Sequence, residues 1–229
     1  MELRDALRTT GAAREFDGTV VPRESVYDLL DTARFAPSGG NRQCWRVVLV
    51  EDPSRKRALR DLYLPGWYEY VAQAQAGLVP FAVVTDEVKA AAAISRAGEV
   101  AAEAAGGPGG FAEHLDEVPV LLLVLADLRY VAALDRDADR YTFVGGASVY
   151  PFAWSILLAA RDVGLGGVMT TMVARHEAEL RGLFALEPHH CVAGVLALGR
   201  PIFQPTKLRR AAVEEFATLD SVDGAPFTR

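Results

Sequence analysis

Cysteine is scarce in this sequence, since its 229 residues include only Cys44 and Cys191. Both lie in apolar runs, and neither belongs to a CxxC pair or to a Cys/His spacing typical of zinc ligands. This pattern argues against a disulfide framework and a zinc site, and it favours a reducing compartment. The first residues, MELRDALRTTGAAREF, also lack the continuous apolar region of a signal peptide, so we expect a cytoplasmic protein.

Positive charge is not in excess, because 24 Lys and Arg residues face 30 Asp and Glu residues and the net charge is -6. Any anion site must therefore be built locally, and nucleic acid is not an expected partner. Long apolar runs are also missing. The strongest candidate for a membrane span, Val144 to Ala160, contains glycines, serines and a proline, and we interpret it as a buried helix. We expect no membrane partner.

Several common signature motifs are absent, namely GxGxxG after a strand, GxxxxGK[ST], HExxH and GxSxG. These are the patterns of dinucleotide, phosphate, zinc and acyl-transfer sites. The four histidines are interpreted as solvated, and the pair His189-His190 after Pro188 favours a turn over a metal site. We predict no metal.

The composition is that of an ordinary globular enzyme, with 51% hydrophobic and 24% charged residues. Apolar patterns and Gly/Pro punctuation predict helices at 3–9, after Pro22, and at 53–63, 65–76, 86–105, 144–163 and 174–184. Strands are predicted at 45–50, 118–126, 167–171 and 191–198. No repeat or linker divides the chain, so we predict one α+β domain over 1–229.

The segment APSGGNRQCW, Ala36 to Trp45, joins a predicted amphipathic helix to a predicted strand. Its glycines let backbone N–H groups approach a flat ring closely, and its polar side chains can match the edge of a conjugated heterocycle. These side chains are Ser38, Asn41 and Gln43. The alternative is a helix-to-strand turn in which Ser38 and Asn41 only cap backbone groups.

Four blocks of the sequence, in order along nearly its whole length, resemble the flavin-dependent nitroreductase family. They are TTGAAREF at 9–16, APSGGNRQCW at 36–45, GASVYPFAWSILLAARDVGLGG at 146–167, and KLRRAAVEE at 207–215 after LGRP. The second block is most similar to an actinobacterial-type branch. The resemblance implies a three-layer α+β fold with a central, mainly antiparallel sheet flanked by helices. It also implies an intertwined homodimer with one FMN in each of two interface pockets.

By matching position, the resemblance assigns cofactor-binding roles to ten residues. Arg14 lies beside the N1/C2-carbonyl edge or the ribityl chain of FMN, where its charge favours anionic reduced flavin. Backbone N–H groups of two glycines that end the long helix lie near flavin N5 and O4, and a basic pair binds the phosphate. The residues that the resemblance assigns to cofactor binding are Arg14, Pro37, Ser38, Gly39, Asn41, Gln43, Gly166, Gly167, Lys207 and Arg209.

Each assignment has a structural alternative. Arg14 could be an ordinary surface arginine, the glycines a helix C-cap, and Lys207 and Arg209 a solvated basic tail. The chain also departs from the family, because Thr10, Gly11 and Ala12 stand where an Arg-x-Ser element is common. Either another arginine replaces the missing phosphate cation, or FMN is held more weakly; the candidates are Arg8, Arg42 and Arg210.

The region 64–116 is predicted to be a mobile, lid-like excursion, and 217–229 a tail. Near the start of the region 64–116, the side chains of Trp67, Tyr68 and Tyr70 could cover the flavin and stack on a substrate. Alternatively, they could pack beneath a helix.

The resemblance implies an FMN-dependent oxidoreductase that takes hydride from NADH or NADPH and reduces a nitroaromatic, a quinone or an activated alkene. No catalytic side chain is needed beyond flavin-tuning Arg14, because the cofactor carries the reaction. Two alternatives remain open: a flavin-binding or sequestering protein without turnover, and a flavin-consuming or oxidative enzyme on the same scaffold.

Overall fold

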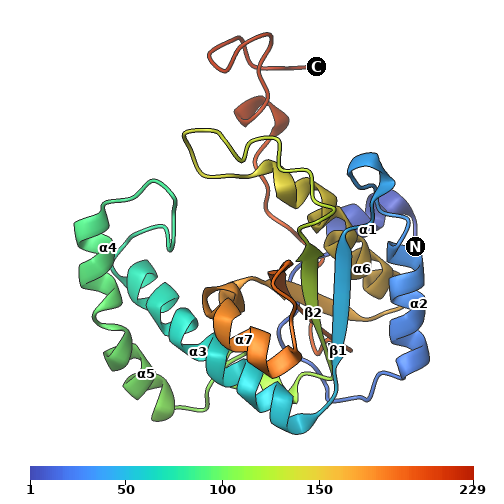
Figure 1. Cartoon of the computed structure of the whole chain (residues 1–229). Helices are drawn as coiled ribbons and strands as arrows, with labels where there is room; N and C mark the ends of the chain where they lie inside the picture. The colour runs from blue at the N-terminus through green and yellow to red at the C-terminus, as the bar shows by residue number, and fades with distance from the viewer.

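A four-stranded antiparallel sheet forms the centre of the protein in a computed structural model that describes residues 1–229 (Figure 1). The strand order is β1-β2-β4-β3, and each neighbouring pair is antiparallel. The strands are β1 (Trp45–Val50), β2 (Val120–Asp127), β3 (Gly166–Thr170) and β4 (His190–Gly199). The predicted α+β class with a mainly antiparallel sheet is thereby confirmed.

The two central strands are buried on both faces. Every residue of β2 is buried, as are the last eight of β4. A continuous apolar run is what a strand needs when helices cover both sides of it, whereas a half-exposed strand would alternate with polar residues. Side chains of β2 alternate between two core clusters, because successive side chains of a strand point to opposite faces.

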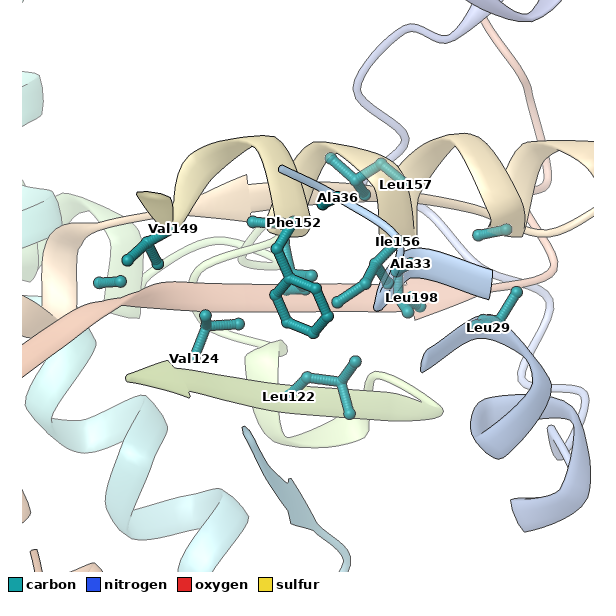
Figure 2. Close-up of a cluster of buried hydrophobic side chains, with 14 of the residues drawn as sticks. Leu29, Ala33, Ala36, Leu122, Val124, Val149, Phe152, Ile156, Leu157 and Leu198 are labelled. Atoms are coloured by element: carbon teal, nitrogen blue, oxygen red, sulfur yellow. The ribbon is translucent and has the colours of Figure 1, made fainter. Parts of the chain in front are cut away.

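One face of the sheet packs against α2 (Arg23–Ala33) and α6 (Tyr150–Asp162). In Figure 2, Phe152 and Ile156 of α6 point toward Leu122 and Val124 of β2. The rings of Trp45 and Phe152 stack with centroids 4.6 Å apart and planes 4° apart. This cluster fixes the start of β1, and therefore the end of the loop that precedes it.

The opposite face packs against α3 (Pro53–Gln75) and α7 (Glu177–Phe184). Beyond α3 lie α4 (Glu87–Ile94) and α5 (Ala97–Ala105), the outer layer on the left of Figure 1. The N-terminal helix α1 (Leu3–Thr9) lies near α6, and the C-terminal tail with η5 (Val213–Glu215) projects from the body (Figure 1). The short 3-10 helices are η1 (Gly39–Asn41), η2 (Leu115–Glu117), η3 (Val144–Ser148) and η4 (Met172–His176).

Several predicted boundaries differ from the structure, mainly in the helices. The two helices predicted on either side of Leu64 are one helix, α3, with Pro65 inside it. Pro65 is exposed, so water can satisfy the carbonyl that loses its hydrogen bond. The stretch 86–105 is two helices rather than one. The α-helix predicted from Val144 begins only at Tyr150, after a 3-10 turn, with Pro151 in its first turn.

The assignment of Gly166 and Gly167 to the end of the long helix is wrong, whereas the strand predicted at 167–171 is confirmed as β3. That helix ends at Asp162, and Gly164 adopts the left-handed conformation (φ +80°) that follows a helix C-terminus. Gly166 and Gly167 instead open β3 and pair with Gly199 and Leu198 of β4. Strand pairing therefore decides their backbone conformation.

None of the helices combines the length and the apolar content that crossing a bilayer requires.

Candidate functional site

The first part of the site forms where the segment after α1 meets the start of β3. The backbone N–H of Ala13 donates to the carbonyl of Gly167 at 3.0 Å, and Ala12 forms a parallel bridge with Gly167. A Cβ atom on Gly167 would collide with the Leu198 side chain and lie 2.5 Å from the Ala197 carbonyl oxygen. Only glycine allows this close packing of backbones.

The chain after β4 returns to the same place. The N–H of Ile202 donates to the Glu15 carbonyl at 3.0 Å, and Gln204 Nε2 donates to the Gly11 carbonyl at 3.2 Å. A Cβ atom on Gly11 would lie 2.9 Å from Leu208 Cδ2. Lys207 and Arg209, both exposed, flank Leu208, so the backbone that carries them passes beside Gly11.

Arg14 is exposed and sits between two residues that are fixed by these backbone bonds, Ala13 and Glu15. It lines a cleft of about 440 Å³ whose opposite wall is the segment that ends the α3–α5 excursion. The lining residues from that wall are Gly109, Gly110, Phe111, His114, Glu117, Val118 and Pro119. The structure thus brings the backbone of Arg14 next to that of Gly166 and Gly167, and it passes the segment that carries Lys207 and Arg209 beside Gly11.

Two polar groups at this place bear on what it could hold. The buried Oε1 atom of Gln204 has no hydrogen-bond partner and faces Gly166, where a Cβ atom would lie only 2.6 Å away. A ligand rich in hydroxyl groups, such as a ribityl chain, would satisfy this acceptor. In contrast, buried Thr10 donates its hydroxyl to the Ala6 carbonyl at 2.7 Å, which caps α1. The Thr10 hydroxyl is therefore not free to replace a phosphate-binding serine.

Exposed cations, closely packed glycine backbone and an unsatisfied acceptor together suit an anionic ligand with a polyol and a flat ring, so the residues present fit FMN. Of the arginines considered as replacements for the missing family cation, Arg210 follows Arg209 directly and its Nη1 donates to the Arg209 carbonyl. Arg8 lies in the last turn of α1, and Arg42 lies in the loop after η1.

Aromatic side chains on one face of α3 continue the site. Tyr63 is buried and accepts a hydrogen bond from Thr170 Oγ1 at 3.2 Å, three residues beyond Gly167. Burial raises the pKa of Tyr63, and the nearby Arg14 charge opposes this. The Trp67 ring lies 6.4 Å from that of Tyr63 and stacks on Tyr70 at 5.5 Å. Trp67 and Tyr70 therefore extend from the Arg14 region toward solvent.

Tyr68, the third aromatic predicted for the substrate, turns to a different neighbour. Burial raises its pKa, and the Glu113 carboxylate beside its hydroxyl raises it further. The same carboxylate accepts a hydrogen bond from the Gly110 N–H at 2.7 Å. Tyr68 therefore connects α3 to the glycine-rich segment 106–110.

The polar loop 37–43 forms a second group. Ser38 Oγ accepts from the Gln43 N–H at 2.9 Å, and the Gly39 N–H donates to Ser148 Oγ at 3.0 Å. Gly40, Asn41 and Gln43 have positive φ angles of 61°, 54° and 49°. Two non-glycine residues in the left-handed region mark a loop whose shape is imposed by its surroundings.

The two groups lie at opposite ends of the sheet. The loop leads into Trp45, which is in register with Ala126 and Cys191, whereas Gly167 is in register with Leu198. Cys191 and Leu198 are seven residues apart along β4, which corresponds to about 20 Å at the rise of a β-strand. One chain therefore does not bring the loop and the Arg14 group into one pocket.

One cluster beside the loop has metal-like spacing, formed by Asp127, His189 and His190. The Asp127 carboxylate is already bound by Arg129 through two hydrogen bonds, at 3.0 and 2.8 Å, and Arg46 Nη2 lies 3.5 Å away. Two guanidinium groups on one carboxylate oppose a further cation, so we assign no metal here. Neither Asp127 nor Ser148 stood out in the sequence, where both lie in apolar segments.

Several known proteins are similar to this chain. A family model described as "Nitroreductase family" matches residues 7–200. The "NADH dehydrogenase" of Thermus thermophilus is 28% identical over 201 residues, which cover 88% of this chain and 87% of that protein.

The fold is shared with solved structures at lower identity. A BluB-like flavoprotein from Clostridium difficile has a TM-score of 0.66 at 20% identity, with 96% of this chain and all of that chain covered. An iodotyrosine deiodinase bound to FMN and 3-iodo-L-tyrosine has a TM-score of 0.59 at 23% identity, with 93% and 96% covered.

Proposed function

The chain belongs to the nitroreductase family, and from this premise we propose that it is an FMN-dependent oxidoreductase. Its proposed reaction takes a hydride from NADH or NADPH and reduces a small-molecule acceptor: a nitroaromatic, a quinone or an activated alkene. The observation that supports the proposal is the meeting of three distant parts of the chain: the segment of Arg14, the glycines that open β3, and the segment of Leu208, which Lys207 and Arg209 flank. Two structural relatives, the BluB-like flavoprotein and the FMN-bound deiodinase, are flavin proteins, which agrees with it.

The cofactor roles divide along the site. Lys207 and Arg209 would bind the phosphate, because charge-assisted hydrogen bonds to an anion are the strongest that such side chains form. Arg14 would lie at the ring and favour the anionic reduced form, and the unpartnered Gln204 oxygen would accept from the polyol chain. The chemistry that FMN supplies is hydride transfer from the nicotinamide and transfer of two electrons to the acceptor.

We further propose that the active form is a homodimer in which the loop 37–43 of one protomer completes the pocket of the other. The separation of the two groups at opposite ends of the sheet supports this arrangement. Large apolar side chains are also exposed where the chain leaves the body, and burying such a surface between copies is favourable. Examples are Tyr141, Phe143, Phe203, Phe216 and Phe227.

The acceptor would meet the stacked Trp67 and Tyr70, with the excursion 64–116 as a lid. Flat aromatic or quinoid acceptors suit stacked rings. The relatives are named for different activities, an NADH dehydrogenase and an iodotyrosine deiodinase, so the acceptor class is kept broad.

The absorption spectrum of the purified protein tests the proposal. We expect a flavin spectrum in a particle of twice the chain mass, bleaching under anaerobic NADH or NADPH, and steady nicotinamide oxidation with menadione. A colourless protein that cannot be reconstituted with FMN contradicts the function. Bound flavin without bleaching or turnover would favour the sequestering alternative, and loss of flavin under oxygen the flavin-consuming one. A monomer with intact flavin binding contradicts the dimer alone.

A further inference from the structure

The polar loop before β1 adopts a conformation that its own sequence disfavours. Asn41 and Gln43 both have positive φ angles, 54° and 49°, and the intervening Arg42 returns to the right-handed region. Side chains with a Cβ atom avoid positive φ because Cβ approaches the following carbonyl. Such a loop keeps its shape only if contacts from outside the loop hold it.

The first outside contact comes from η3. The Ser148 hydroxyl is buried and accepts from the Gly39 N–H at 3.0 Å, at the start of the loop. The Ser148 carbonyl also faces Cys44 Sγ at 3.7 Å, just after the loop. Ser148 therefore holds both ends of the loop from the neighbouring segment.

The second contact is an arginine that bridges the loop to a buried anion. Arg46 Nη1 donates to the carbonyls of Trp45 at 2.8 Å and Gln43 at 3.4 Å, and its Nη2 lies 3.5 Å from Asp127 Oδ2. The Asp127 side chain is fully buried, and its backbone N–H donates to the Cys44 carbonyl at 2.7 Å. The left-handed Gln43 is thus connected to the sheet through a fixed charge.

Arg46 is not needed to neutralise that charge. Arg129 alone binds both oxygens of Asp127 and also donates its backbone N–H to Oδ1. These hydrogen bonds hold the pKa of Asp127 well below its usual range, so the carboxylate stays charged at any working pH. Arg129 already pairs with the carboxylate, so what Arg46 adds is its pair of hydrogen bonds to the carbonyls of Gln43 and Trp45. Arg129 does not make these bonds.

We propose that Arg46, oriented by the buried Asp127 carboxylate, and Ser148 are positioning residues that hold the loop 38–43 in its flavin-binding shape. None of the three is among the residues assigned to the cofactor. The inference rests on the proposed function for the ligand of the loop, but the tethers themselves lie within one chain. It adds to the proposed function that flavin affinity depends on Arg46 and Ser148, which lie at the end of the sheet opposite to Arg14.

The test compares two arginines that share one carboxylate. Arg46→Gln removes the tether, and the matched variant Arg129→Gln removes the stronger partner of Asp127 but leaves the contacts to Gln43 and Trp45. FMN is titrated into each apo protein, and amide hydrogen exchange of residues 39–44 is followed in the same apo samples.

We expect Arg46→Gln and Ser148→Ala to weaken FMN about tenfold and to speed exchange across the loop. Arg129→Gln should lower the melting temperature more than Arg46→Gln, yet change FMN affinity less than twofold. Arg46→Lys, which keeps the charge but loses the planar fork, should restore only part of the affinity. Equal FMN losses in the two Gln variants, or unchanged loop exchange in Arg46→Gln, would overturn the inference. Failure of the wild-type protein to bind FMN would instead contradict the proposed function, and the exchange comparison would still stand.

Discussion

Ala13 and Gly167 are joined by a 3.0 Å hydrogen bond from the Ala13 N–H to the Gly167 carbonyl, beside the parallel bridge of Ala12. This contact adds the N-terminal segment to the edge of β3. It also fixes the backbone on one side of Arg14, whose other neighbour, Glu15, is bound by Ile202. The position of Arg14, the proposed flavin-tuning cation, thus depends on a glycine far away in the sequence.

Gly167→Ala should destabilise the protein and loosen FMN, because the new Cβ would press on the Leu198 side chain and the Ala197 carbonyl. We expect a loss of about 1–3 kcal/mol in the free energy of unfolding, measured by urea denaturation. Gly182→Ala in α7 is the control, since no other group lies within 4 Å of the place that its new Cβ would take, and it should be neutral or stabilising. Similar stability of the two variants would contradict this account of β3.

Neutralising Lys207 and Arg209 together should weaken FMN at least tenfold and leave riboflavin, which lacks the phosphate, nearly unaffected. Titrations of both ligands into the apo protein measure the difference. The double variant Lys89→Gln/Arg96→Gln makes the same change in net charge at α4 and α5, where both cations are exposed. Equal losses for FMN and riboflavin would show that the pair does not bind the phosphate.

Arg14→Ala should weaken FMN and riboflavin alike and make the flavin reduction potential more negative. The loss of a cation near the ring removes stabilisation of the anionic reduced form. A tenfold loss in relative affinity for reduced flavin corresponds to about 30 mV for a two-electron couple. Equilibration with reference dyes measures the reduction potential. Arg14→Lys keeps the positive charge, so its potential should stay close to that of the wild type. An unchanged potential in Arg14→Ala would assign the residue to the surface.

His114 should make the glycine-rich segment at the mouth of the cleft sensitive to pH. Its Nε2 lies 2.8 Å from the Pro108 carbonyl and its Nδ1 3.1 Å from Glu117 Oε1, and both partners are pure acceptors. Both bonds therefore need a protonated ring. The Pro108 carbonyl and then the Glu117 carboxylate raise the pKa of His114, with Glu113 adding a smaller effect.

A raised pKa in the folded state gives stabilisation that is complete below the unfolded pKa, about 6.5, and is lost as pH rises through the folded value. Amide exchange of residues 106–110, corrected for its intrinsic pH dependence, should show protection falling over that window. His114→Gln should have low protection that does not vary with pH. Protection that is flat in the wild type would rule out this role.

Trp67→Ala should raise the KM for aromatic acceptors about two- to tenfold, since stacked rings contribute about 0.5–1.5 kcal/mol beyond their area. FMN affinity should hardly change, because the Trp67 ring belongs to the excursion rather than to the Arg14 segment. Tyr27→Ala, at an exposed aromatic position on α2, is the control. A rise in KM that is the same for aromatic and small acceptors would contradict stacking.

The tertiary structure decided which predicted residues meet. Loop 37–43 and the Arg14 group are separated along β4 by strand register, which local sequence patterns do not encode. Likewise the resemblance placed Gly166 and Gly167 at the end of a helix, whereas both pair with β4 at the start of β3, the strand predicted at 167–171. The tethers Ser148, Asp127 and Arg46 were missed because each acts through a contact with another element of the fold.

The sequence by itself determined all four strands of the sheet and the amphipathic helix α2, because burial on one or both faces leaves an apolar pattern. The sequence also identified the polar loop 37–43 and the basic pair Lys207/Arg209 as candidates for ligand binding, because their glycines and their polar and charged side chains are visible without a fold. Only the tertiary structure decided that the segment of Arg14 pairs with Gly167 while the loop lies at the other end of the sheet. Long-range backbone pairing sets those distances, and no single segment carries that information.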